Sequence, residues 1–157
     1  MENKNLHFLK KLLSDLILEE YEHRPFFSCN DHDDIKLPGV ETKNLLLKAD
    51  VPVLCVIPCA KKLNVKVLKQ ILSLSSINFA SAEECKEVLN SEPGHLSVLG
   101  LLLTKAKAKV IFDSILEHEK IQLHPCLNTV TWIFESKALI DFLKNFGLDP
   151  TVHRISC

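Results

Sequence analysis

The chain has 157 residues, of which 46% are hydrophobic and 25% are charged, and its 19 Lys and Arg residues nearly balance its 20 Asp and Glu residues. This length and composition predict one globular domain with enough apolar material for its own core, so that neither a metal ion nor a disulfide is needed to hold the fold together. A nearly neutral chain cannot bind nucleic acid through its overall charge, and any contact with RNA would have to use a local basic patch.

The N-terminal segment has the apolar spacing of an amphipathic helix. Leu6, Leu9, Leu13 and Leu16 recur three or four residues apart, which predicts a helix over about residues 3–20. The segment is charged and lacks a continuous apolar core, and no stretch of the sequence approaches the length of a transmembrane span. These features predict a cytoplasmic protein without a signal peptide.

Two apolar runs predict the centre of the fold. Residues 42–48 and 51–57 have the composition of paired central strands, and the consecutive leucines at 45–47 indicate a strand that is covered on both faces. Lys43 and Asn44 are unexpected at the start of such a buried strand. Considered alone, Lys43 would be a strand-end lysine whose ammonium group reaches solvent or an ion-pair partner.

The rest of the chain alternates short helices and strands without a regular βαβ repeat. Asn64 is placed to cap a helix, Ser81 and Glu84 have the spacing of a capping box, and Gly147 has the position of a helix stop. The predicted helices are 65–72, 81–92 and 136–146, and the predicted strands are 77–79, 109–113, 120–124 and 129–134. Together these elements predict a single α+β (mixed α/β) domain over residues 1–157, with one central mixed sheet flanked by helices.

The sequence lacks the common motifs of metal sites, thiol chemistry and serine hydrolases. It contains no CxxC pair, no Cys₂His₂ spacing and no HExxH motif, and GHLSVLG does not have the spacing of a nucleophile elbow. We therefore expect no bound metal, no cofactor and no disulfide, with free thiols buried in a reducing compartment. The six cysteines are Cys29, Cys55, Cys59, Cys85, Cys126 and Cys157.

Two groups of lysines form basic stripes. Each stripe is most simply a solvated face, although either could line the path of a phosphate backbone. The stripes are Lys62, Lys66 and Lys69 on one predicted helix, and Lys105, Lys107 and Lys109 before the next strand.

Six segments occur in an order that resembles the YbaK/ProX family of aminoacyl-tRNA editing domains, from about residue 20 to residue 150. They are YEHRPFF, GVETKNLLLKAD, NFASAEEC, EPGHLSVLGLL, VIFD and IQLHPCLNTVTWIF. The most specific parts are KNLxLK and HPxxNT, and within the family the chain is most similar to the free-standing prolyl-tRNA editing proteins. The resemblance implies a YbaK/ProX-like fold and an aminoacyl-tRNA hydrolase that removes alanine from mischarged proline tRNA. The implied partners are the acceptor end of that tRNA and a prolyl-tRNA synthetase, with no DNA and no membrane.

The resemblance also implies the residues of the site. Lys43 would hold the terminal adenosine or its phosphate and orient the ester, the loop at Gly94 would contact the aminoacyl carbonyl, and His124 would be the histidine of the pocket. The 2′-hydroxyl of the terminal adenosine would help to activate water. The further substrate-binding residues implied are Asn44, His95, Ser97, Val98, Asn128 and Thr129.

The loop at Gly94 departs from the family pattern. The pattern is GxxxP, and Val98 stands here in place of the proline. Two alternatives therefore stay open beside alanine editing. The chain could remove another small amino acid such as cysteine or serine, because pocket size separates small side chains poorly, or it could bind tRNA or a synthetase without catalysis.

Overall fold

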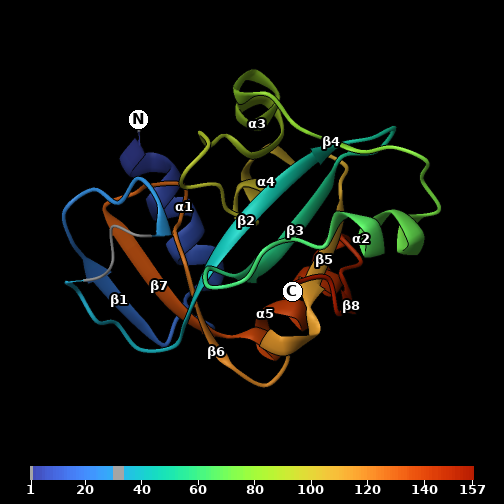
Figure 1. Cartoon of the computed structure of the whole chain (residues 1–157). Helices are drawn as coiled ribbons and strands as arrows, with labels where there is room; N and C mark the ends of the chain where they lie inside the picture. Colours follow the sequence, from blue (N-terminus) through green and yellow to red (C-terminus); the bar gives the residue numbers. More distant parts are fainter. Residues whose placement is uncertain (1, 30–33) are drawn as a thin grey trace.

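The computed structural model describes residues 2–29 and 34–157. In these residues, eight strands form one sheet in the order β1-β7-β6-β2-β3-β5-β8, with β4 paired to β2 (Figure 1). The strands are β1 Glu19–Glu22, β2 Val40–Lys48, β3 Val53–Pro58, β4 Asn78–Phe79, β5 Lys109–Asp113, β6 Lys120–Leu123, β7 Val130–Glu135 and β8 Thr151–His153. Parallel and antiparallel pairs both occur, which confirms the predicted mixed sheet in an α+β domain.

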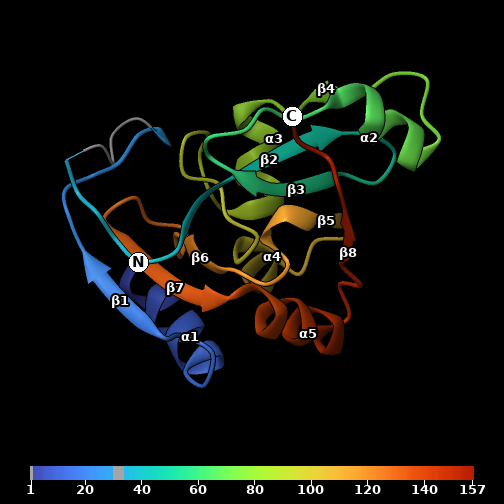
Figure 2. The same ribbon diagram turned by 60° about the horizontal axis from the view of Figure 1, so that its bottom comes forward.

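Helices cover both faces of this sheet. The α-helices are α1 Glu2–Leu13, α2 Val65–Leu72, α3 Ala82–Leu89, α4 Gly100–Thr104 and α5 Ser136–Phe146. Figure 2 shows α2 on one side of the sheet and α4 and α5 on the other. Leu46 belongs to the larger apolar cluster with α1, α3, α4 and α5, whereas Leu47 belongs to the cluster that includes Leu68 of α2. The leucine run of β2 therefore lies between two layers, as its composition predicted.

The central strand pair and the helix caps also match the sequence analysis. β2 and β3 are antiparallel neighbours inside the sheet, and every residue of β3 is buried. Asn64 Oδ1 accepts from the Val67 N–H group at 3.2 Å. Ser81 and Glu84 form the reciprocal capping box of α3.

The N-terminal helix is shorter than its apolar spacing predicted. It ends at Leu13, where the Leu16 and Ile17 N–H groups both donate to the Leu13 carbonyl oxygen. The chain then enters β1, whose residues Glu19–Glu22 pair with β7 at the edge of the sheet. Hydrogen bonding to that edge outweighs the local helix preference, because a helix continued to residue 20 would leave the β7 backbone without this partner.

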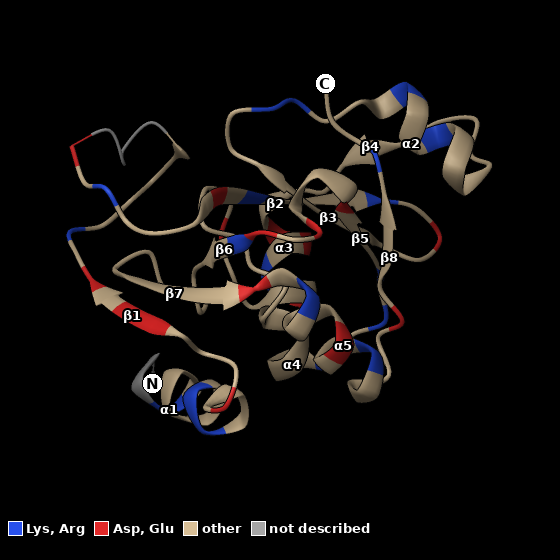
Figure 3. Cartoon of the chain, turned by 90° about the horizontal axis from the view of Figure 1, so that it is seen from below, with Lys and Arg blue, Asp and Glu red and all other residues tan. Residues whose placement is uncertain are grey.

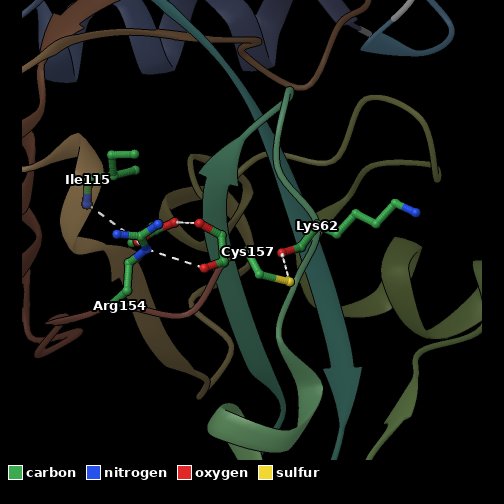
Figure 4. Close-up of polar contacts among 6 residues, drawn as sticks. Lys62, Ile115, Arg154 and Cys157 are labelled. Carbon is green, nitrogen blue, oxygen red and sulfur yellow. Dashed lines mark hydrogen bonds and ion pairs between the residues drawn. The ribbon is translucent and has the colours of Figure 1, made fainter.

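A polar cluster fixes the last residues of the chain against β5 (Figure 4). The Asp113 side chain is fully buried and accepts from the Ser156 hydroxyl and from the Ile115 N–H group. Arg154 Nε lies 3.9 Å from Asp113 Oδ1. Lys62 and Cys157 exchange two backbone hydrogen bonds, so the segment after β8 also closes on the loop after β3.

Among the residues that the structure describes, none of the helices combines the length and the apolar character of a membrane span.

Candidate active site

The site lies where the sheet divides along one edge of β2. That edge pairs with β6 at Val40 and Glu41, and with β4 at Leu47 and Lys48. Between these points no strand of the described chain pairs with it. The segment 94–98 lies there instead, so a loop faces the part of β2 that carries Lys43 and Asn44.

A cavity of about 220 Å³ opens at this position. It is lined by residues 27–29, 42–45 and 94–96, together with Cys59 and His124. Because successive side chains of a strand point to opposite faces, a run of four lining residues shows that the cavity opens on the edge of β2. Its volume is below the roughly 300–1,000 Å³ of pockets that bury whole drug-sized ligands, so it suits a small group.

The structure brings together five of the residues that the sequence suggested. Lys43, Asn44, Gly94, His95 and His124 all line this cavity, although they come from three distant parts of the chain.

The other four suggested residues lie elsewhere. Ser97 and Val98 are fully buried and do not line the cavity. Asn128 and Thr129 line a neighbouring cavity of about 560 Å³, and His95 belongs to the walls of both cavities.

Asn44 holds the loop to the strand. Its Oδ1 atom accepts from the Val98 N–H group at 2.7 Å, and both residues are buried. Ser97 Oγ accepts from the Leu99 N–H group at 3.1 Å, in the turn just before α4 begins. The unexpected asparagine in a buried strand is therefore a fixed acceptor for the backbone of the loop.

Gly94 lies close to the backbone of Phe27. Its φ is +101°, and a Cβ atom at this position would lie 2.6 Å from the Phe27 carbonyl oxygen. Only glycine meets both conditions without a shift of the backbone. Phe27 is 69% exposed and lines both cavities, so it forms an apolar rim that the sequence analysis did not assign.

The expectation that all thiols are free is wrong at two positions. Cys29 and Cys59 form a disulfide with their Cα atoms 5.8 Å apart, and both residues line the cavity. They are 30 residues apart and belong to no motif, so only the folded chain reveals the pair. The disulfide joins the segment at Phe27 to the end of β3, at the wall that also contains Lys43.

Two of the free cysteines, Cys55 and Cys126, are not poised as nucleophiles. Burial raises the pKa of the Cys55 thiol to about 12 and that of the Cys126 thiol to about 11. Both thiols are thus protonated near neutral pH, where only the thiolate is strongly nucleophilic. No group of three or more potential metal ligands occurs among the residues that the structure describes.

The two lysine stripes lie on the surface. Lys62 and Lys66 are exposed and Lys69 is half-buried, whereas Lys105, Lys107 and Lys109 are all exposed from the end of α4 to the first residue of β5. Figure 3 shows basic residues along α2.

Comparison with known proteins identifies the family. The aminoacyl-tRNA editing domain matches residues 36–142. The chain is 31% identical over 124 residues to the prolyl-tRNA synthetase associated domain-containing protein 1 of Bos taurus, covering 74% of this chain and 72% of that protein. It is 26% identical over 133 residues to the prolyl-tRNA editing protein ProX of Acetoanaerobium sticklandii, covering 80% and 81%.

Solved structures agree on the fold. A protein proposed as a trans-editing enzyme for prolyl tRNA synthetase superposes with a TM-score of 0.78 at 11% identity, covering 98% of this chain and 96% of that chain. The crystal structure of a hypothetical protein gives a TM-score of 0.77 at 17% identity, covering 98% and 99%. The family match spans the strand with Lys43, the loop at Gly94 and the strand end at His124, so this chain belongs to the aminoacyl-tRNA editing domain family and is an aminoacyl-tRNA deacylase, a hydrolase.

Proposed function

We propose that this chain is a trans-editing deacylase that removes alanine from mischarged proline tRNA. The observation that carries the proposal is the small cavity at the divided edge of β2, where Lys43, Gly94 and His124 converge in a chain of the editing family. The similarity to a prolyl-tRNA editing protein supports proline tRNA as the carrier.

The chemistry is hydrolysis of an activated ester. Water adds to the carbonyl carbon, and the carbonyl oxygen takes up the negative charge. The intermediate collapses with cleavage of the bond to the ribose oxygen, which takes a proton and leaves as a hydroxyl group. The products are alanine and uncharged tRNA, and no covalent bond to the protein is required.

The loop would stabilise the charge that develops on the carbonyl oxygen. We assign this role to the N–H groups of Gly94 and Leu96, two residues that line the cavity. The neighbouring N–H groups are used elsewhere, because that of His95 donates to a carbonyl within the turn and that of Val98 donates to Asn44. Fixed amide donors of this kind favour the transition state over the bound substrate.

Lys43 and His124 would act on the other parts of the substrate. The ammonium group of Lys43 suits the terminal phosphate or the adenosine hydroxyls, which would orient the ester over the loop. His124 provides an imidazole, whose neutral form can accept a hydrogen bond from a hydroxyl group or water.

The small size of alanine gives the reason for a second site. A synthetase pocket built for proline rejects a smaller side chain weakly, because a missing methylene costs only about 1–3 kcal/mol. A second site that admits alanine and excludes the proline ring supplies the missing discrimination. The cavity at β2 is our candidate for that second site. Prolyl-tRNA synthetase produces the mischarged substrate, and an association with it belongs to the same proposal.

The direct test is release of labelled amino acids from tRNA. We expect the purified protein to release alanine from proline tRNA well above a no-enzyme control and to leave prolyl-tRNA intact. Serine and cysteine on the same tRNA complete the panel. Faster release of either would reassign the substrate. A wild-type rate equal to the control, with folded protein and cognate tRNA, would support a binding protein of the same fold instead.

Gly94→Ala tests whether the rate of alanine release depends on the position of the loop and not only on the stability of the fold. The added methyl group meets the Phe27 carbonyl oxygen, so the loop must move. A displacement of about 1 Å at reacting groups costs on the order of 10²-fold in rate. We expect alanine release to fall by about that factor, measured at saturating tRNA.

Gly147→Ala is the matched control. Gly147 has a φ of +99° at the end of α5, but nothing lies within 4 Å of the added Cβ atom. It should lose stability through the same backbone strain, about 1–3 kcal/mol, while keeping its rate. Equal loss of rate in both variants would show that strain alone, and not the loop contact, is responsible.

A further inference from the structure

A chain of hydrogen bonds lies behind His124. His124 Nδ1 is 2.9 Å from the Val130 carbonyl oxygen and 3.3 Å from Thr131 Oγ1. Thr131 Oγ1 is 2.7 Å from His23 Nε2, and His23 Nδ1 is 2.8 Å from the Arg24 carbonyl oxygen. The chain thus joins the cavity wall to the segment after β1, and Thr131 at its centre is fully buried.

The carbonyl groups at the two ends favour protons on the Nδ1 atoms. A carbonyl oxygen only accepts, so the Val130 contact favours a proton on Nδ1 of His124 and the Arg24 contact favours one on Nδ1 of His23. In neutral His23 the Nε2 atom is then an acceptor, and the Thr131 hydroxyl donates to it. The Thr131 Oγ1 atom can then accept from the Nδ1–H group of His124. With the protons in these positions, every donor and acceptor named in this series of hydrogen bonds has a partner.

His23 is itself held firmly. Its ring stacks on Phe26, with centroids 3.8 Å apart and planes 10° from parallel, and Phe26 is buried. The His23 N–H group donates to the Thr129 carbonyl oxygen at 3.0 Å, and the Phe26 N–H group donates to that of Asn128 at 2.9 Å. The segment 128–129, which the sequence suggested as substrate-binding, thereby anchors His23.

We infer that His23 and Thr131 are positioning residues that fix the tautomer of His124 for the deacylation proposed above. With its proton on Nδ1, His124 has Nε2 as its basic nitrogen, the atom that can accept a hydrogen bond from water or from a hydroxyl group of a tRNA terminus. The inference rests on the proposed function for its catalytic part, but the tautomer itself is a property of the free protein.

His23 matters because a hydroxyl group can donate in more than one direction. Without an acceptor at His23 Nε2, the Thr131 hydroxyl can rotate and donate to Nδ1 of His124. That arrangement favours a His124 ring with its proton on Nε2, which leaves no basic nitrogen for the substrate. His23 prevents this by engaging the hydroxyl hydrogen.

The test compares His23→Phe with His23→Gln. Phenylalanine keeps a ring that can stack on Phe26 but offers no acceptor, whereas glutamine offers an amide oxygen near the original Nε2 position. The tautomer of His124 is read from two-bond ¹H–¹⁵N correlations of the free protein. We expect Nδ1 protonation in the wild type, a shift toward Nε2 protonation in His23→Phe, and recovery in His23→Gln. Deacylation should fall by about 10- to 100-fold in His23→Phe, as for other groups that orient a functional histidine, and glutamine should restore most of it.

A second substitution identifies the hydroxyl as the cause. Thr131→Val removes it and leaves the Val130 carbonyl oxygen as the partner of Nδ1, so the double variant His23→Phe/Thr131→Val should return to the wild-type tautomer. Thr131→Ser, which keeps a hydroxyl, should resemble the wild type in both readouts.

The inference is overturned if wild-type His124 carries its proton on Nε2, or if His23→Phe and His23→Gln give the same tautomer and the same rate. These outcomes differ from failure of the proposed function, in which the spectra follow the expected pattern while the wild type releases no amino acid.

Discussion

Lys43→Ala is expected to lower the rate of alanine release by about 10²–10³-fold, the loss typical of removing one charge-stabilising group from an active site. Lys43 lies opposite Ile57 in the pairing of β2 with β3, and its side chain is half-buried at the cavity. It belongs to neither apolar core cluster, so its removal should leave the thermal midpoint nearly unchanged.

Lys48→Ala provides the matched control on the same strand. Lys48 is largely exposed, and its Nζ atom lies 3.7 Å from Glu84 Oε2. An exposed ion pair of this kind contributes about 0–1 kcal/mol to stability. The variant should keep both its rate and its stability. If Lys43→Ala deacylated as fast as Lys48→Ala, the ammonium group at the cavity would have no part in the reaction.

Lys43→Arg tests whether the reaction needs only a positive charge at this position or also the compact geometry of the ammonium group. A guanidinium group keeps the charge but is planar and larger than an ammonium group. We expect it to recover tRNA binding, seen in KM, while kcat stays well below the wild-type value. Full recovery of kcat would instead show that charge alone is enough at this position.

The sequence predicted those elements whose local signals agree with their tertiary contacts. β2 and β3 are apolar because both faces of the sheet are covered, and α3 begins where the Ser81 capping box predicts. The short β1, β8 and α4 were missed, because a strand of three or four residues and a single helical turn depend on their neighbours for stability.

The sequence could suggest which residues belong to the candidate site, but it could not show the contacts between them. Family resemblance pointed to Lys43, Gly94 and His124, and the fold places all three at one cavity. No sequence pattern joins Cys29 to Cys59, or His23 to Thr131, since these pairs are 30 and 108 residues apart. Their contacts arise from the pairing of strands that are distant in the chain.

Val98→Pro has the second-largest expected effect. Two contributions to the free energy of unfolding oppose each other at this position. Val98 precedes Leu99, the N-cap residue of α4, and proline with its fixed φ is tolerated near the start of a helix. Proline has no N–H group, however, and would leave the buried Asn44 Oδ1 atom without its donor. An unsatisfied buried acceptor costs about 1–3 kcal/mol, which exceeds the gain of about 0.4–1 kcal/mol from a favourable proline. We therefore expect lower stability and slower alanine release.

A double-mutant cycle with Asn44→Ala tests whether the lost hydrogen bond is the cause. If it is, Val98→Pro should add little to Asn44→Ala, and the two changes should show a coupling free energy of about 0.5–3 kcal/mol in denaturant unfolding. Additive effects, or a faster reaction in Val98→Pro, would mean that backbone stiffness positions the loop and that the contact with Asn44 is incidental. The expected coupling would instead show that this chain replaces a stiff proline with a hydrogen bond from the loop to β2. Asn44 in the buried strand and Val98 in the loop would then act together, through this hydrogen bond, to hold the Gly94 loop over the cavity.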